Sequence, residues 1–264
     1  MRVLSLFDGM SCGQIALDKA GIDVDLYFAS EIDKYAIEIT QKNYPHTIQY
    51  GDVQELQSRD LPKIDLLIGG SPCQGFSFAG KQLNFDDPRS KLFFEYVRLL
   101  RELKPKYFLL ENVKMRKDIQ DVISKELGVE PIEINSSLVS AQTRTRLYWT
   151  NIPNVSRPAD KGMKLSDIIE NGYVDQDKSY CLDANYYKGG NLKSYFEKHR
   201  RQLVFSGESM KEYRKLTPLE CERLQTVPEG YTECVSNTQR YKMLGNGWTV
   251  DVIAHIFKGL NGVK

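Results

Sequence analysis

The chain has 264 residues, a formal net charge of +1 and a hydrophobic fraction of 41%. This length can bury the core of one large domain, or of one domain with a small second one, and the near-zero charge excludes a global electrostatic attraction to nucleic acid or membranes. Only short apolar runs occur, so we expect no membrane contact. The five cysteines are scattered and there are only three histidines, which predicts no metal site. Because the cysteine count is odd, we expect free thiols in a reducing, cytoplasmic compartment.

Short apolar runs alternate with helical patterns along the first 151 residues. We expect strands at 3–7, 26–30, 47–50, 65–69, 107–111, 132–139 and 147–151. We expect helices at 12–20, 33–43, 90–103, 115–127, 217–225 and 249–259. This alternation predicts βαβ units and therefore an α/β fold with a mainly parallel, Rossmann-like sheet. Ligands of such sheets bind at the carboxyl ends of the strands.

The composition changes after the last of these strands. Residues 152–214 are rich in Pro, Gly, Asn, Tyr and Lys and contain no long periodic helix. We therefore predict a first domain at 1–151, a small irregular lobe at 152–214 and a C-terminal segment at 215–264 that returns to the first domain. A regular helix resumes behind Thr217 and Pro218, a capping residue followed by a proline in the first turn.

Ligand-type residues follow three successive strands. The first strand runs into Phe-Asp-Gly at 7–9 and then Gly13, a turn whose glycines let the backbone approach a ligand. Glu31 follows the second strand, where an acid can hold ribose hydroxyls, and Asp52 follows the third, where it could accept from an adenine amino group. Either acid alone is more often a strand-end cap, but together they predict a nucleoside pocket. Because there is no phosphate loop, S-adenosylmethionine is the favoured cofactor.

A reactive cysteine is predicted where the fourth strand ends. The apolar run 64–68 leads into Gly-Gly-Ser-Pro-Cys-Gln-Gly at 69–75, and Cys73 is well placed there to be a nucleophile. A buried structural thiol is the commoner role of a lone cysteine. We expect that role for the other four, Cys12, Cys181, Cys221 and Cys234.

Charged residues follow the next strands. Glu111 comes directly after the apolar run 107–110, and a carboxylate leaving a buried strand must be paired or protonated, which suits a general acid. Gln142, Arg144 and Arg146 share one face of an extended segment. The two guanidinium groups can pair with Glu111, a carbonyl oxygen or a phosphate. Taken alone, this segment would be a solvated basic edge strand.

Six of these motifs together resemble those of the DNA (cytosine-5)-methyltransferases, in the order that this family has. They are the Phe-x-Gly turn at 7–9, Pro-Cys-Gln at 72–74, Glu-Asn-Val at 111–113, Gln-x-Arg-x-Arg at 142–146, Leu-Thr-Pro-Leu-Glu-Cys-Glu-Arg-Leu-Gln at 216–225, and Gly-Asn-Gly at 245–247. Each is weak to moderate alone, but six in register are specific. The resemblance covers the chain from Val3 to its end, except for the middle lobe.

The resemblance implies a fold, a reaction and roles for individual residues. The sheet would be that of the S-adenosylmethionine-dependent methyltransferases, and the enzyme would methylate C5 of a cytosine flipped out of the duplex. Cys73 would add to C6, Glu111 would contact N3 and the exocyclic amine, and Arg146 would contact O2, with Arg144 beside them as a further catalytic residue. Phe7 would stack on adenine. The cofactor-binding residues would be Phe7, Asp8, Gly9, Gly13, Glu31, Ile32, Asp52, Val53, Pro72, Leu92, Asn246 and Trp248.

Two positions depart from the pattern of many bacterial members. The glycines of the first turn are at 9 and 13 rather than clustered, and Trp248 stands where a small aliphatic residue is usual. Both features are similar to animal de novo DNA methyltransferases and to some phage enzymes.

Double-stranded DNA is the partner that the resemblance implies, with the middle lobe as the target-recognition region. Residues 188–215 hold eight Lys or Arg against three acids, interleaved with aromatic residues, which suits a surface facing a DNA groove. A solvated basic face is the alternative. We also expect the loop 74–90 to close over the flipped base. The predicted DNA contacts are Gln74, Ser77, Arg89, Lys193, Lys198, Arg200 and Arg201.

Three other functions compete with this interpretation. A branch of the same family methylates transfer RNA, and the recognition lobe argues for DNA. A catalytically silent DNA-binding homologue is opposed by the intact set of Cys73, Glu111 and Arg146. A nicotinamide-dependent oxidoreductase is opposed by the glycine spacing. We expect a monomer without a metal, in the cytoplasm of a bacterium or a phage-infected cell.

Overall fold

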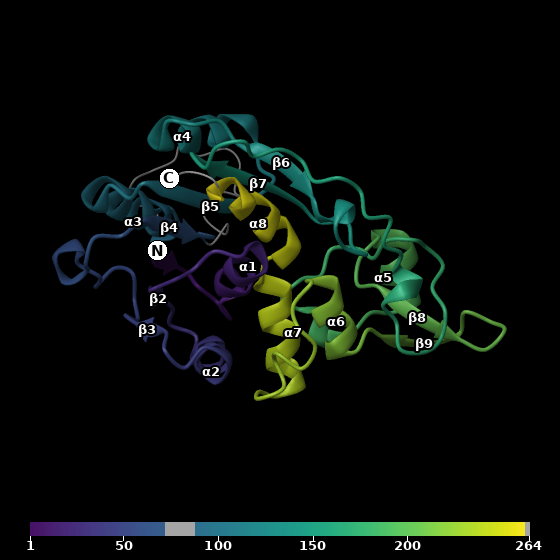
Figure 1. Cartoon of the computed structure of the whole chain (residues 1–264). Helices are drawn as coiled ribbons and strands as arrows, with labels where there is room; N and C mark the ends of the chain where they lie inside the picture. Colours follow the sequence, from purple (N-terminus) through teal and green to yellow (C-terminus); the bar gives the residue numbers. More distant parts are fainter. Residues whose placement is uncertain (72–87, 262–264) are drawn as a thin grey trace.

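The computed structural model describes residues 1–71 and 88–261 (for 88–90 the backbone only), and it has the predicted α/β architecture (Figure 1). Within these ranges one seven-stranded sheet has the order β3-β2-β1-β4-β5-β7-β6. Its strands are β1 (Arg2–Leu6), β2 (Leu26–Ser30), β3 (Ile48–Gln49), β4 (Leu66–Gly69), β5 (Tyr107–Val113), β6 (Ile132–Asn135) and β7 (Thr145–Thr150). Pairing is parallel from β3 to β5, and β7 runs antiparallel to both β5 and β6.

The structure describes eight α-helices, and all but the fifth contribute to the buried cores on the two faces of this sheet. They are α1 (Cys12–Ala20), α2 (Lys34–Asn43), α3 (Pro88–Leu103), α4 (Lys117–Leu127), α5 (Leu192–Lys198), α6 (Pro218–Leu224), α7 (Asn237–Asn246) and α8 (Val250–Phe257). Short 3₁₀ segments occur at Ser58–Asp60, Ser136–Leu138, Leu165–Asp167, Tyr186–Lys188 and Lys258–Leu260.

Each face of the sheet has its own core, because successive side chains of a strand point to opposite sides. Val3 and Leu66 belong to a buried cluster with the apolar side chains of α1, α2 and α8. Leu4 and Leu67, one residue further along the same strands, belong to a second cluster with α3 and α4. The C-terminal segment therefore returns to the sheet, where α8 packs against α1.

The segment 152–214 is more regular than its composition suggests. Strands β8 (Leu203–Ser206) and β9 (Glu212–Lys215) form an antiparallel hairpin, and α5 precedes them. Tyr195, Leu203 and Phe205 form a small core of their own. Most of the lobe is irregular, as expected, and the hairpin was not foreseen because its two strands are only four residues long and lack the long period that marks a helix. Figure 1 shows this lobe extending from the side of the sheet.

Two further elements differ from expectation. Helix α7 was not predicted, because its sequence is polar and lacks an apolar stripe, and contacts such as that of the Tyr241 hydroxyl with Leu216 O (2.8 Å) hold it in place. The predicted strand at 132–139 ends at Asn135, where the Asn135 side chain accepts from Ser137 N (3.0 Å) and turns the chain into a 3₁₀ segment.

An ion pair joins the lobe to the C-terminal segment. Arg214 at the end of β9 binds Glu220 of α6 with two hydrogen bonds of 2.8 and 2.7 Å. Glu220 is fully buried and also caps its own helix by accepting from Thr217 N at 2.7 Å. A buried, multiply bonded carboxylate of this kind fixes the direction in which the hairpin leaves the sheet.

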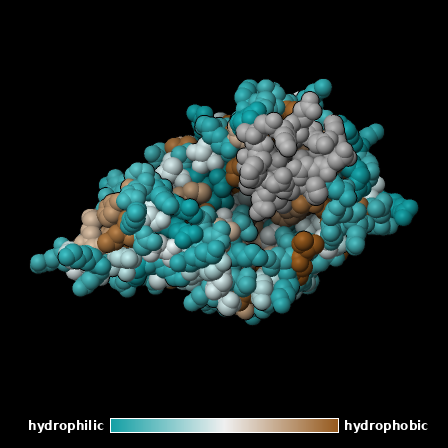
Figure 2. All heavy atoms as spheres, turned by 180° about the vertical axis from the view of Figure 1, so that it is seen from behind, coloured by the Kyte–Doolittle hydropathy of each residue, from teal (hydrophilic) through white to brown (hydrophobic). Residues whose placement is uncertain are grey.

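The surface is largely hydrophilic in the view from behind, with several small hydrophobic patches, one of them on the lobe (Figure 2). Phe196, Met210 and Tyr213 of the lobe are 38–47% exposed. Within 1–71 and 88–261, no helix is both long and apolar enough to cross a membrane.

Candidate active site

The predicted residues gather at one edge of the sheet. The last residues of β1, β2 and β4 are in register, with Leu6 paired to both Ser30 and Gly69. Strand β5 continues past the end of β4, because Gly69 pairs with Leu110 and Glu111 follows. Carboxyl ends of parallel strands therefore bring the glycine turn, Glu31 and Glu111 to the same edge, as expected.

Glu31 is held by main-chain donors. Its Oε2 accepts from Gly9 N (2.7 Å), and its Oε1 accepts from Ile32 N (2.8 Å) and Asp33 N (2.9 Å). The carboxylate thereby links the turn after β1 to the start of α2, and Gly9 takes part with a φ of +59° that favours glycine. A carboxylate has about four acceptor sites and three are taken here, so Glu31 is fixed in position while Oε2 can still accept from a hydroxyl group.

An apolar surface lies beside this carboxylate. Phe7 and Leu92 pack against the same core cluster, and Phe7 adopts a left-handed backbone conformation with a φ of 56°. Ile32, directly after Glu31, is 73% exposed, which is unusual for a large aliphatic side chain in a folded chain. A nucleoside base would cover such side chains.

The predicted cofactor residue after the third strand, Asp52, has less direct structural support. Asp52 lies three residues after the end of β3, and its Oδ1 accepts from Gln54 N at 2.9 Å, the bond of a local turn. Its neighbour Val53 is buried in the core below. Binding of an adenine amino group by Asp52 stays a prediction.

Asp8 has a structural network of its own. Its Oδ1 accepts from the Tyr27 hydroxyl at 2.8 Å, and its Oδ2 accepts from the Ser11 hydroxyl. Burial nevertheless raises the pKa of Asp8 to about 6, and the nearby Glu31 charge adds to that effect. The Tyr27 contact could not be predicted, since a tyrosine inside a strand is ordinarily a packing residue. These bonds support the turn, and the predicted contact of Asp8 with the cofactor is untested.

Gly13 is required by packing. A Cβ at this position would lie 2.5 Å from Ile68 Cδ1 and 2.8 Å from the Tyr27 hydroxyl. The start of α1 can therefore approach the strands this closely only with glycine, and its predicted role toward the cofactor is untested. Asn246, the last residue of α7, is exposed.

Glu111 is the centre of a second group. It is buried, its Oε1 lies 2.9 Å from Arg146 Nε, and its Oε2 accepts from Trp248 Nε1 at 3.1 Å. The pairing follows from register, because Val113 of β5 faces Arg146 of β7 and Glu111 is two residues away on the same face. Burial is the largest single effect on Arg146 and opposes its charge, but the Glu111 carboxylate together with Cys181 and Tyr148 outweighs burial, so the pKa of Arg146 is raised.

Arg144 faces different partners. Its guanidinium donates to Leu182 O (2.9 Å), Gly247 O (2.9 Å) and Gly245 O (3.3 Å), and its Nη1 lies 3.3 Å from Cys181 Sγ. It is 4% exposed, and burial lowers its pKa. The predicted partners of the two arginines were Glu111, a carbonyl oxygen or a phosphate. Arg146 pairs with Glu111, and Arg144 donates to carbonyl oxygens. These contacts suit a residue that positions the surrounding loops.

Several predicted residues lie outside the described part of the chain. They are Pro72, Cys73, Gln74 and Ser77, together with the side chain of Arg89 and the expected closure of the loop 74–90. The residue before them, Ser71, is described, and Asn112 Nδ2 donates to both its carbonyl oxygen (3.2 Å) and its hydroxyl (3.1 Å). The residue next to Glu111 therefore holds the start of the segment that contains Cys73.

The remaining cysteines only partly follow expectation. Cys12 and Cys221 are buried, and burial raises the pKa of Cys12 to about 12, so both are structural as predicted. Cys181 is exposed, and the prediction that it is buried is wrong, because Leu182 beside it takes the buried position. Cys234 is half-buried.

The cations of the lobe divide into two kinds. Lys193 and Lys198 lie on α5 and are exposed, as a phosphate contact requires. Arg200 is also exposed and makes a 3.3 Å ion pair with Asp183. Arg201 is partly buried and donates to Gly189 O at 2.8 Å, so a DNA contact by Arg201 would require release of that bond.

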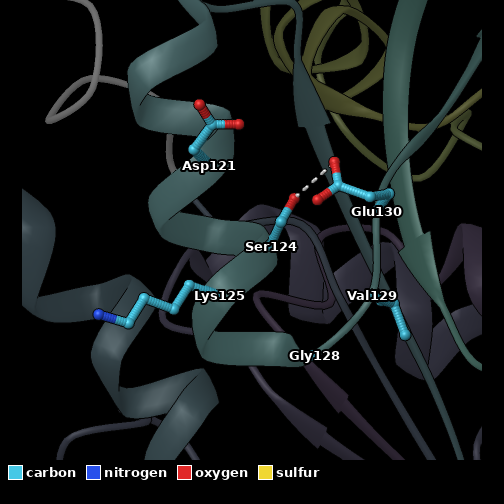
Figure 3. A pocket seen from close by; sticks show the side chains of 6 residues that line it. All are labelled: Asp121, Ser124, Lys125, Gly128, Val129 and Glu130. Carbon is cyan, nitrogen blue, oxygen red and sulfur yellow. Dashed lines mark hydrogen bonds between the residues drawn. The ribbon is translucent and has the colours of Figure 1, made fainter.

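A depression of about 390 Å³ lies elsewhere, at the C-terminal end of α4. Figure 3 shows its lining, Asp121, Ser124, Lys125, Gly128, Val129 and Glu130, with Ser124 hydrogen-bonded to Glu130. Because α4 runs antiparallel to the strands that it connects, this depression is at the amino-terminal edge of the sheet, away from Glu31 and Glu111.

Residues 1–127 and 116–262 match the family model described as C-5 cytosine-specific DNA methylase. The chain is 32% identical over 310 residues to the Type II methyltransferase M1.ScrFI of Lactococcus lactis subsp. cremoris, covering 96% of this chain and 76% of that protein. It is 46% identical over 116 residues to the orphan methyltransferase M.SPRI of Bacillus phage SPR, covering 43% and 26%.

Solved structures agree at the level of the fold. The Dnmt2 methyltransferase of S. pombe superposes with a TM-score of 0.74 over 99% of both chains, at 20% sequence identity. The family model spans almost the whole sequence, and the elements that bear its motifs form one edge of a single sheet. The chain therefore belongs to the family of C-5 cytosine-specific DNA methylases.

Proposed function

We propose that this chain transfers a methyl group from S-adenosylmethionine to C5 of a cytosine flipped out of a specific sequence in duplex DNA, with Cys73 as the covalent nucleophile. The observation that carries the proposal is the buried Glu111 carboxylate, paired with Arg146 beside the strand that leads to Cys73. Family membership supports the reaction class, and the lysines exposed on α5 support a polyanionic partner.

The part of the carboxyl edge around Glu31, which we call the cofactor edge, has the acceptor and the apolar surface that an adenosyl group needs. Glu31 is preset by three main-chain donors and keeps acceptor capacity for ribose hydroxyls, and Ile32 offers an exposed apolar surface to a base. The residues therefore fit S-adenosylmethionine, which supplies an electrophilic methyl group when bound. Phe7 and Asp52 would complete the adenine site.

The chain's own residues would prepare the base. Addition of the Cys73 thiolate to C6 forms a sulfur–carbon bond and moves an electron pair onto the ring, which makes C5 nucleophilic. Glu111 would bind N3 and the exocyclic amine, and Arg146 would bind O2, so that the displaced charge is stabilised where it develops. Loss of the C5 proton and departure of Cys73 then restore the aromatic ring.

The decisive experiment measures transfer of labelled methyl from S-adenosylmethionine to unmethylated duplex DNA of mixed sequence. Cys73→Ala and a transfer-RNA substrate are assayed beside the wild type. We expect 5-methylcytosine in DNA from the wild type and none from the variant. Turnover by Cys73→Ala would refute the covalent role, and label in RNA alone would move the chain to the transfer-RNA branch.

The setting of the enzyme belongs to the same proposal. Named relatives come from a lactic bacterium and a Bacillus phage, which supports the cytoplasm of a bacterium or of a phage-infected cell. A monomer is proposed, and sedimentation of the purified chain tests it.

A further inference from the structure

Trp248 contacts the carboxyl group on which the proposed base recognition depends. Its indole Nε1 donates to Glu111 Oε2 at 3.1 Å, while Arg146 Nε lies 2.9 Å from Oε1. The two oxygens of Glu111 thus have different donors, one from β7 and one from the loop between α7 and α8. A carboxylate that accepts from a separate donor on each oxygen is restrained in its orientation, because rotation about its terminal bond would break both hydrogen bonds.

Glycine makes this contact possible. A Cβ on Gly70 would lie 3.0 Å from Trp248 Nε1 and 3.1 Å from Glu111 Oε2, so any side chain at residue 70 would push the two groups apart. At its other end the indole reaches the cofactor turn, where a Cβ on Gly13 would lie 3.7 Å from Trp248 Cζ3. The ring therefore spans from the start of α1 to the carboxyl group of Glu111.

The backbone on both sides of the indole is held by buried side chains. Gly247 O accepts from Arg144 Nη2 (2.9 Å) and from Gln225 Nε2 (3.2 Å). On the other side, the Thr249 hydroxyl donates to Gln225 Oε1 at 2.9 Å. Because Arg144, Gln225 and Thr249 are all buried, the loop that carries Trp248 is anchored within the core rather than free to swing.

We propose that Trp248 is a positioning residue for Glu111: its indole N–H holds one carboxylate oxygen so that the remaining acceptor sites face the cytosine. This inference rests on the proposed function, since it assigns Glu111 to the base. Arg144 does not contact Glu111 in this arrangement but holds the loop that carries Trp248, through its bond to Gly247 O. The cofactor role predicted for Trp248 from the resemblance is a separate effect, and the two are distinguished by which kinetic constant changes.

The kinetic test compares Trp248→Phe with Trp149→Phe. Each substitution removes one indole N–H donor, but Trp149 is in the core and donates to Ser124 Oγ (3.0 Å), away from Glu111. Loss of a hydrogen bond to a charged group should lower kcat of Trp248→Phe roughly 10- to 100-fold. KM for S-adenosylmethionine should stay within about threefold, and Trp149→Phe should keep nearly full kcat.

Two kinetic outcomes would overturn the inference. Equal kcat in the two variants would show that the indole donor does nothing special at Glu111. A rise in KM for S-adenosylmethionine with kcat unchanged would leave only a cofactor contact. A wild type that methylates no DNA would instead refute the proposed function.

A fluorescence measurement tests the contact without any turnover. The chain has two tryptophans, so in Trp149→Phe the emission comes from Trp248 alone. Excitation moves electron density from the pyrrole ring of indole toward the benzene ring, so a carboxylate at Nε1 stabilises the excited state. Adding Glu111→Gln to Trp149→Phe should therefore shift the emission of Trp248 to shorter wavelength. Glu126→Gln on α4, added to the same background, is the control that removes a carboxylate charge elsewhere. An unchanged spectrum would contradict the contact, whatever the activity.

Discussion

The carboxyl edge of the sheet has two parts, the cofactor edge around Glu31 and the base edge around Glu111, and each holds its carboxylate in a different way. Glu31 is bound by three main-chain N–H groups, all within one turn and the start of one helix. Glu111 is bound by two side chains, Arg146 and Trp248, that lie 35 and 137 residues further along the chain.

This difference determines which substitutions each edge tolerates. A carboxylate held by the main chain keeps its position when neighbouring side chains change, so the placement of Glu31 depends little on other side chains. A site made by side chains can be damaged by changes at each of them. Most of the following variants change one of the two parts of the site and leave the other intact.

The largest effect is expected at the base edge. Glu111→Gln removes the charge paired with Arg146 and the acidic group proposed to act at N3, so methyl transfer should slow roughly 10²–10⁴-fold. Single-turnover transfer to duplex DNA measures it, with Glu126→Gln on the surface of α4 as the control. A rate within a few-fold of wild type would remove Glu111 from the base site.

At the cofactor edge, Glu31→Ala should act on binding rather than on the chemical step. Loss of the acceptor for ribose hydroxyls should raise KM for S-adenosylmethionine about 10- to 100-fold, with a kcat close to that of wild type at saturation. Glu38→Gln on the exposed face of α2 is the matched control. A fall in kcat at unchanged KM would mean that the two edges are not separate.

Asp8 offers a pH test of the cofactor turn. Its pKa is raised from 3.8 to about 6 by burial, so the folded protein binds a proton more tightly than the unfolded chain between those pH values. The buried charge of Asp8 therefore lowers the free energy of unfolding, by its full amount above about pH 6. This cost disappears as the pH falls toward 4 and Asp8 is protonated. Asp8→Asn should raise the free energy of unfolding by about 1–3 kcal/mol at pH 8 and by little at pH 4.

Urea unfolding of both proteins at the two pH values measures this difference. A stability gap that is the same at pH 4 and pH 8 would contradict the assignment, and a variant that is less stable at pH 8 would show that the bonds from Tyr27 and Ser11 require the charge.

The smallest effect is expected outside both edges. The double variant Lys193→Gln and Lys198→Gln should weaken DNA binding at low salt and reduce the slope of log affinity against log salt by about 1–2, one charge per phosphate lost. The saturated rate should not change. A control pair at the amino-terminal edge, Lys106→Gln and Lys125→Gln, should leave the slope unaltered. An unaltered slope in the first pair would place the phosphate contacts elsewhere.

The parts of this molecule that depend on local pattern were predictable. Short apolar runs and helical stripes located the strands and the main helices, and parallel pairing then brought Glu31 and Glu111 to one edge. Glu111 was one of three partners that the sequence allowed for the two arginines, and the antiparallel pairing of β5 with β7 selects it for Arg146.

Contacts between distant segments were not predictable. Trp248 was expected at the cofactor, yet its indole N–H binds Glu111, and no local signal links residues that far apart. Helix α7 is polar and depends on tertiary contacts, and the partners of Arg144 come from both the lobe and the C-terminal loop. The Gly-Gly pair at 69–70 was the one available sign, since glycine at a strand end indicates a close approach.

The most direct test of the two-edge account is equilibrium binding of labelled S-adenosylmethionine, without DNA, to wild type, Glu31→Ala and Glu111→Gln. The account predicts weaker binding by Glu31→Ala and wild-type binding by Glu111→Gln. Wild-type binding by Glu31→Ala, or a loss of binding in Glu111→Gln as large as that expected for Glu31→Ala, would contradict it.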